Sequence, residues 1–196
     1  NLVNKLAEKF YQSNYDIKVI LNEIFTSKWF FDEKNIGTKI KSPIELMVGI
    51  QKILPITIEN PKTLIIYQKL LGQMLLNPPN VAGWPSGKAW IDSSTLMLRL
   101  KTPQIWSGII SLDYAPKDDD DQNMGMMQKM LPKNLQGNFK IDWESVSKNL
   151  KNENLEDILL QSKKSIPENV INEFEIADEF KSRVIALMST PEYQLC

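Results

Sequence analysis

Apolar side chains recur at helical spacing through the first part of the chain, a pattern that predicts amphipathic helices. One stripe contains Leu2, Leu6 and Phe10, and the next contains Ile17, Ile20, Leu21 and Ile24. We expect two antiparallel helices joined near Asn14. The second should end by residues 29–31, and residues 32–41 should form a connecting loop.

The clearest helix start lies at Ser42-Pro43-Ile44-Glu45. It combines a hydroxyl N-cap, a proline at the first helical position and a glutamate at the third, so free backbone amides are satisfied and the proline torsion suits the helix. Asn60-Pro61 predicts another helix, which should run through Leu75. Asn77-Pro78-Pro79 should end it, because prolines lack the backbone donor and disfavour helical torsions in the residue before them.

Beyond the tryptophan-containing segment that follows Asn77, the predicted helices are shorter and the composition of the chain changes. Asp92 or Ser93 should cap a short helix, and Thr102-Pro103 should open one more turn or helix toward Ile110. Residues 111–140 hold an acidic run and a cluster of methionines, which indicates an insertion or mobile loop. Further helix starts and a final amphipathic helix are expected at Asp142-Trp143, Asn154-Leu155, Ser165-Ile166-Pro167-Glu168 and residues 177–188.

The fold class that these patterns predict is all-α: an irregular multi-helix bundle with long loops and about seven to nine helices. We expect one domain over residues 1–196, with the first-half helices forming the core and the final helix packing back on them. The segment from Leu135 to Ile141 is the only weak candidate for a strand.

Composition excludes several classes of function. The chain has 23 basic and 24 acidic residues and no histidine, so neither a global positive field for nucleic acid nor a histidine-dependent nucleophile or zinc site is expected. The single Cys196 cannot form an internal disulfide or a multi-thiolate site. The apolar runs are far shorter than the ~20 residues that span a bilayer. We therefore predict no nucleic-acid partner, no membrane span, no metal site and no cofactor.

The segment from Asn77 to Trp90, called the tryptophan loop below, carries the strongest candidate binding site. It holds three prolines, two glycines and two tryptophans without helical or alternating periodicity. Stiffened in this way, its indoles would form a platform for a sugar ring or a protein partner. The alternative is that both indoles close the end of the bundle as core residues. The predicted binding residues are Asn80, Trp84, Lys88, Trp90, Asp92 and Arg99.

Arg99 stands out because 21 of the 23 basic residues are lysines. A guanidinium could clamp a carboxylate with two hydrogen bonds, and Asp92 lies about two helical turns earlier. The partner could belong to a ligand, or the arginine could be an internal brace.

Carboxylates are the remaining catalytic possibility, because a glycosidase needs two of them roughly 5 to 9.5 Å apart. The candidates are Glu45, Asp92, Asp113 and Glu192, although helix capping already explains Glu45 and Glu192. The acidic run at residues 118–121 lacks the glycine and glutamate that a calcium-binding EF-hand needs at its sixth and twelfth positions, so we interpret it as a solvated loop. Met124, Met127 and Met130 would dock a partner helix or simply pack a short helix.

Three stretches resemble a bacterial family called domain of unknown function 1800. The longest runs from Leu75 to Leu100 and contains Asn77-Pro78-Pro79-Asn80-Val81-Ala82-Gly83-Trp84-Pro85. The others are Lys39 to Gly49 and Leu187 to Gln194, whereas the middle of the chain matches nothing we can place. The resemblance implies a mainly helical protein, often exported and often longer than this chain, with no established activity.

From that resemblance we expect the C-terminal portion of a longer protein, consistent with the missing initiator methionine, and a periplasmic or secreted location. The functional hypothesis is a noncatalytic binding or scaffold module that contacts an envelope polysaccharide or a protein partner through the tryptophan loop. The alternative is a carboxylate-dependent hydrolase acting on a polysaccharide.

Overall fold

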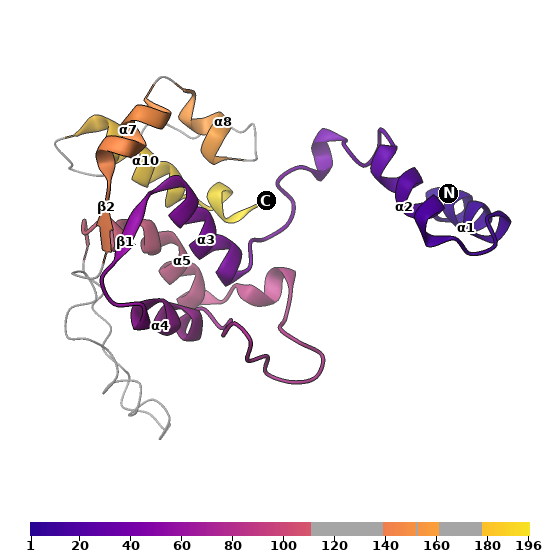
Figure 1. Cartoon of the computed structure of the whole chain (residues 1–196), viewed down its shortest axis with the longest axis horizontal. Coiled ribbons are helices and arrows are strands. Elements are labelled where there is room, and N and C mark those ends of the chain that lie inside the picture. The colour runs from indigo at the N-terminus through magenta and orange to yellow at the C-terminus, as the bar shows by residue number, and fades with distance from the viewer. Residues whose placement is uncertain (111–138, 152, 161–177) are drawn as a thin grey trace. The chain divides into compact units, whose positions relative to one another are not determined.

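The computed structural model describes residues 1–110, 139–151, 153–160 and 178–196. By its internal contacts the chain divides into two compact units, Asn1–Thr38 and Lys39–Cys196, and each is described by itself. The described residues form eight α-helices and a single two-stranded sheet (Figure 1). The predicted all-α class is therefore confirmed, whereas one domain over residues 1–196 stays a prediction.

The first unit is a helical hairpin followed by a short 3-10 helix. Helices α1 (Leu2–Gln12) and α2 (Ile17–Thr26) are antiparallel, as the apolar spacing predicts, and η1 (Glu33–Asn35) follows (Figure 1). Asn14 and Tyr15 both adopt positive φ in the connection, and Lys9 pairs with Glu23 across the two helices.

Within its own unit, no residue of this hairpin is buried, and a core role for α1 and α2 stays a prediction. A unit of 38 residues has too little apolar surface to enclose a core of its own. Helix α2 also ends at Thr26, earlier than predicted, and residues 28–31 form a turn.

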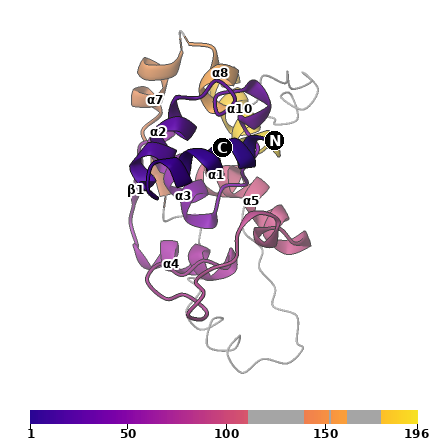
Figure 2. The same ribbon diagram turned by 90° about the vertical axis from the view of Figure 1, so that its right-hand side faces the viewer.

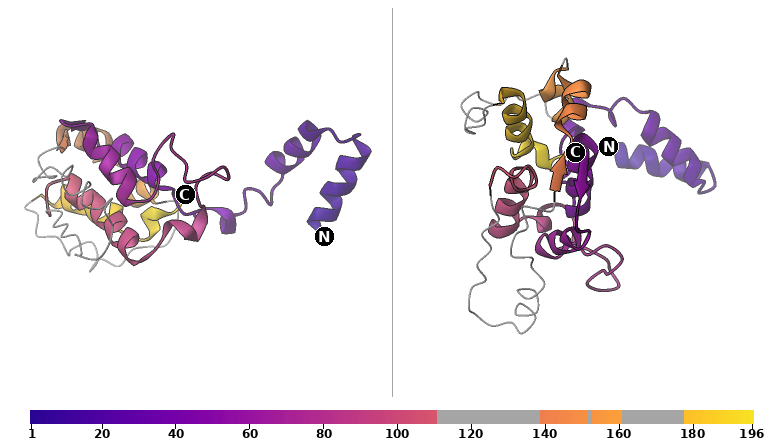
Figure 3. Two further views of the ribbon diagram at one scale, coloured as in Figure 1. Left: turned by 90° about the horizontal axis from the view of Figure 1, so that it is seen from below. Right: turned by 60° about the vertical axis from the view of Figure 1, so that its left-hand side comes forward.

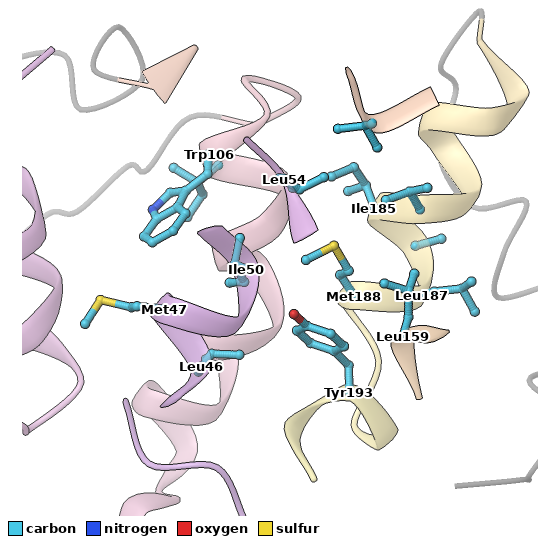
Figure 4. Close-up of a cluster of buried hydrophobic side chains, with 14 of the residues drawn as sticks. Leu46, Met47, Ile50, Leu54, Trp106, Leu159, Ile185, Leu187, Met188 and Tyr193 are labelled. Atoms are coloured by element: carbon cyan, nitrogen blue, oxygen red, sulfur yellow. The ribbon is translucent and has the colours of Figure 1, made fainter. Parts of the chain in front are cut away.

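The core of the second unit is built by α3 (Pro43–Ile53), α4 (Lys62–Leu70), α5 (Ser93–Trp106) and α10 (Glu179–Met188) (Figures 1 and 2). The final helix packs back on the others, as predicted. Figure 4 shows Tyr193 among the buried side chains of α3 and α10, including Leu46, Ile50 and Met188. Trp106 packs edge-on to Tyr67 and stacks on Phe139 at 4.7 Å between ring centroids, so these three rings join α4, α5 and a strand.

Both strands of the sheet are short. Strand β2 (Phe139–Ile141) lies within the weak strand candidate and pairs antiparallel with β1 (Ile56–Ile58), which was not predicted (Figure 3). Helices α7 (Trp143–Leu150) and α8 (Leu155–Leu159) follow, capped by Asp142 and Asn154 as expected. Most of the proposed insertion at residues 111–140, Asp113 and the start at Ser165-Ile166-Pro167-Glu168 lie outside the described residues.

Two helix boundaries differ from the predicted ones. Helix α4 ends at Leu70 and not at Leu75, because Gly72 adopts φ +86°, which glycine tolerates without strain. Helix α5 continues through Pro103 to Trp106 instead of restarting at Thr102-Pro103. Pro103 has no backbone N–H to donate to the carbonyl of Arg99 four residues earlier. In the same turn the Thr102 hydroxyl donates to the carbonyl of Leu98 at 2.7 Å.

Candidate functional site: the tryptophan loop and its base

The tryptophan loop leaves the end of α4 and returns through the 3-10 helix η2 (Gly87–Trp90) to α5 (Figure 1). Its far end is fixed by Trp90, whose side chain is only 6% exposed. The carbonyl of the same residue accepts from the Thr95 hydroxyl at 3.2 Å, in the first turn of α5. The end of the loop is therefore anchored by a buried indole and by a hydrogen bond to the helix that follows.

Asp92 completes this anchor as the N-cap of α5. One carboxylate oxygen accepts from the amides of Ser94 and Thr95 at 2.9 and 2.8 Å, and the Asp92 amide donates to the Thr95 hydroxyl at 2.9 Å. The bonds from Thr95 and Ser94 hold the pKa of Asp92 below its ordinary value. The carboxylate is thus committed to capping.

The near end of the loop is held by two glutamine side chains. Gln73 accepts from the amide of Ile44 at 3.0 Å, which ties the segment after α4 to the start of α3. Gln68 accepts from the amide of Leu75 at 2.8 Å. Both ends of the tryptophan loop are therefore bonded to helices of the second unit.

Between these anchors, residues 75–82 are all exposed. Leu76 is 90% exposed and Val81 is fully exposed. Asn80 shapes the turn between them, because its side-chain oxygen accepts from the amide of Ala82 at 2.8 Å and its carbonyl accepts from Gly83 at 3.1 Å. Leu76 comes directly before the tryptophan loop and Val81 lies within it; we call these two residues the loop tip.

Leu76 has φ +64°, a left-handed torsion that costs a residue with a Cβ roughly 1–2 kcal/mol. It holds this conformation while its side chain makes little contact with the rest of the protein. The segment is therefore shaped by its anchors and its prolines, and not by burial of Leu76.

The six predicted binding residues fall into two groups. Asn80 and Lys88 are exposed and Trp84 is partly exposed, so these three are accessible from solvent. Trp90, Asp92 and Arg99 have structural positions: a buried anchor, a helix cap and a buried hydrogen-bonding centre. Trp90 has the position that the alternative predicted, because its indole is buried as a core residue.

Arg99 lies at the base of the loop and is completely buried. Its Nε donates to the side-chain oxygen of Gln194 at 3.2 Å, and its Nη2 donates to the carbonyl of Lys41. The predicted pairing with Asp92 is wrong, because the Asp92 carboxylate caps α5 while the guanidinium points to the C-terminal segment. The expected internal brace exists, but it joins α5 to two other parts of the chain.

The C-terminal segment reaches this base as an extended strand-like piece after the 3-10 helix η4 (Glu192–Gln194). Lys41 donates from its amide to the carbonyl of Gln194 at 2.8 Å, and Cys196 exchanges backbone hydrogen bonds with Lys39. The ammonium of Lys41 donates to the carbonyl of Tyr193 at 2.6 Å and lies over the Tyr193 ring. The three stretches singled out in the sequence, residues 39–49, 75–100 and 187–194, thus meet around Arg99.

The comparison with protein families extends the resemblance beyond these three stretches and through the middle of the chain. The family model described as a protein of unknown function (DUF1800) matches residues 1–195. The chain belongs to the DUF1800 family. No curated protein and no solved structure matches it.

The carboxylates of this DUF1800 chain that were considered for catalysis are largely committed to helix starts. Glu45 accepts from the amide of Ser42 at 2.7 Å and pairs with Lys39, and these two contacts lower its pKa. A general acid of a glycosidase needs a raised pKa, which neither Glu45 nor Asp92 has. Glu192 is partly buried in η4.

The predicted binding residues centred on the two indoles and did not include Leu76 or Val81. A signal was present: residues 70–87 contain no charged side chain, although charged residues make up 24% of the protein. Leu76 and Val81 both lie in this uncharged stretch.

In the described part of this DUF1800 chain, no helix combines the length and apolar character that crossing a bilayer requires. Within the same residues, no group of three or more acidic or cysteine side chains is placed to hold a metal ion.

Proposed function

We propose that this DUF1800 chain is a noncatalytic helical binding module of an exported bacterial protein, and that it contacts a protein partner or an envelope polymer through the tryptophan loop. The observation that carries the proposal is the loop tip: Leu76 and Val81 are exposed to solvent on a segment whose two ends are bonded to the helical core. Export and bacterial origin follow from what the family resemblance implies.

Fixed ends favour binding because they remove part of its entropic cost. A flexible loop loses conformational freedom when it docks, whereas a segment that already holds its bound shape loses less. Here three prolines, the Asn80 turn and the buried Trp90 restrict the loop before any partner arrives.

The apolar tip favours a protein partner over a polysaccharide. Sugar rings stack on exposed aromatic faces and need polar groups around them, while Leu76 and Val81 offer aliphatic surface in an uncharged segment. Aliphatic side chains of this size instead fill apolar pockets, each contributing roughly 1.5–3 kcal/mol when fully buried. A polysaccharide would depend on Trp84, which keeps part of its surface exposed.

The carboxylate hydrolase is the second candidate. The positions of its carboxylates at helix starts argue against it. Glu45 and Asp92 both have lowered pKa values and both satisfy backbone amides of the helices that they begin. Their loss should therefore reduce stability before it affects any chemistry.

Photo-crosslinking from the loop tip tests the proposal. A photoreactive amino acid placed at Val81 should capture one discrete partner in cells, and the same amino acid at Val48, an exposed valine on α3 that is 44% exposed, serves as the matched control. Capture at position 81 that disappears with Leu76→Ser supports a protein partner. Retention on a glycan array that disappears with Trp84→Ala supports a polymer instead. If the protein shows neither capture of a partner nor retention on the glycan array, the binding role is refuted.

A further inference from the structure

Arg99, at the base of the tryptophan loop, is a buried cation whose hydrogen-bond partners among the described residues are neutral. Arg99 is 0% exposed, and its hydrogen-bond acceptors are the amide oxygen of Gln194 and the carbonyl of Lys41, both neutral. The ammonium of Lys41 also binds a neutral carbonyl, that of Tyr193. Among the described residues, no carboxylate forms an ion pair with either cation.

Negative charge does act on Lys41. It comes from Cys196 and, to a smaller extent, from Glu45, whose own contacts are with Lys39 and Ser42. Burial lowers the pKa of Arg99 to about 10, which still leaves the guanidinium charged at neutral pH. A buried charge without a counter-charge is strongly unfavourable. Among the described residues none pairs with Arg99, so its burial requires an explanation.

Free hydrogen-bond donors accompany the unpaired charge. Nη1 of Arg99 and the side-chain nitrogen of Gln194 are both buried and have no hydrogen-bond partner in the part of the chain that the structure describes. They belong to two side chains that are joined by one hydrogen bond of 3.2 Å. Buried donors are nearly always satisfied in folded proteins. An ordered water would satisfy a donor but would leave the charge uncompensated.

We propose that Arg99 and Gln194 bind one small inorganic anion of the halide class, enclosed when the second unit folds. The size limit follows from burial, because Arg99 is 0% and Gln194 3% exposed, so a larger ligand has no access. The anion compensates the buried charge and accepts from the free donors. The site would thereby hold together the three stretches that meet beneath the tryptophan loop.

Chloride-dependent unfolding tests this site. Urea unfolding is followed at increasing chloride, with gluconate, too bulky to be enclosed, holding the ionic strength constant. One anion bound only by the folded state makes the folding equilibrium constant rise about tenfold for each tenfold increase of chloride above its dissociation constant. An equilibrium constant that does not depend on chloride overturns the proposal.

Two variants separate a specific site from a general salt effect. Gln194→Glu places a carboxylate beside the Nε of Arg99, so its stability should no longer depend on chloride. Arg183→Gln changes the only other arginine of the chain, which forms an exposed pair with Glu156, and should keep the full dependence. Equal chloride dependence in wild type and Gln194→Glu contradicts the proposal.

Diffraction from wild-type crystals grown in bromide gives a direct answer even if Gln194→Glu does not fold. An anomalous peak within hydrogen-bond distance of the Arg99 guanidinium is the expected result. A water molecule there, or no peak, overturns the proposal.

Discussion

Replacing Trp90 with alanine tests whether the tryptophan loop is anchored where the structure places its anchor. A buried tryptophan removes about 200 Å² from water, which at ~25 cal/mol per Å² corresponds to about 5 kcal/mol as an upper limit. Buried tryptophans replaced by alanine lose about 3–5 kcal/mol. Because Trp90 is 6% exposed, we expect Trp90→Ala to lower the free energy of unfolding by about 3–4 kcal/mol.

Val81→Ser is the matched comparison at the other end of the same loop. Val81 is fully exposed, so its replacement should change the free energy of unfolding by no more than about 0.5 kcal/mol. Urea unfolding followed by far-ultraviolet circular dichroism measures both variants. The reasoning is refuted if Trp90→Ala loses less than about 1 kcal/mol, or if Val81→Ser loses as much as a buried position does.

Three further predictions concern single features of the second unit. Ser42→Ala should lower the free energy of unfolding in urea by about 1 kcal/mol because it breaks the capping box of α3. Ser86→Ala, at a cap without a side-chain hydrogen bond, should lower it by less than half as much. Equal losses would contradict the capping argument. Leu76→Gly should raise the melting temperature slightly, since relief of the positive φ outweighs the added freedom of the unfolded chain, about 0.4–1 kcal/mol; a lower melting temperature would count against that strain. Burial raises the pKa of Tyr67 and Tyr193 above the ordinary value of 10.0. Their contribution to stability is therefore complete below pH ~10 and is lost as the pH rises toward their folded-state pKa values. In a variant whose other three tyrosines are replaced by phenylalanine, absorbance at 295 nm should show both ionising only as the protein unfolds, and ionisation in the folded protein would disprove their burial.

The sequence predicted helix starts well because capping is local chemistry. Ser42 and Glu45 form the expected capping box, and Asp92 caps α5, since both depend only on residues within one turn. The final helix and its place against the core were also predicted, because a stripe of apolar residues at helical spacing must be buried against something.

Features that depend on distant residues could not be predicted in this way. Arg99 meets Lys41 and Gln194, which lie 58 and 95 residues away along the chain, and no local pattern specifies that meeting. Pro103 stays inside α5 because of its surroundings, against its local preference.

The sequence located the segment that holds the candidate site, but it did not show which of the side chains in that segment face solvent. The tryptophan loop was identified from its prolines and indoles, yet whether an indole faces solvent depends on what packs against it. Trp90 is buried, while Leu76 and Val81, which carry no aromatic ring, are the exposed residues. The proposed site is therefore centred on Leu76 and Val81 and not on the two indoles.

Thiol reactivity at the loop tip tests the central claim most directly, namely that the tryptophan loop presents Leu76 and Val81 to solvent. Cys196 is the only natural cysteine, so Val81→Cys in a Cys196→Ser background carries one thiol, and Leu46→Cys, at a 0% exposed position, is the buried control. The account predicts that the thiol at position 81 reacts with a disulfide reagent as fast in the folded protein as in urea, while the thiol at position 46 reacts only after unfolding. A thiol at position 81 that is protected until the protein unfolds would contradict it.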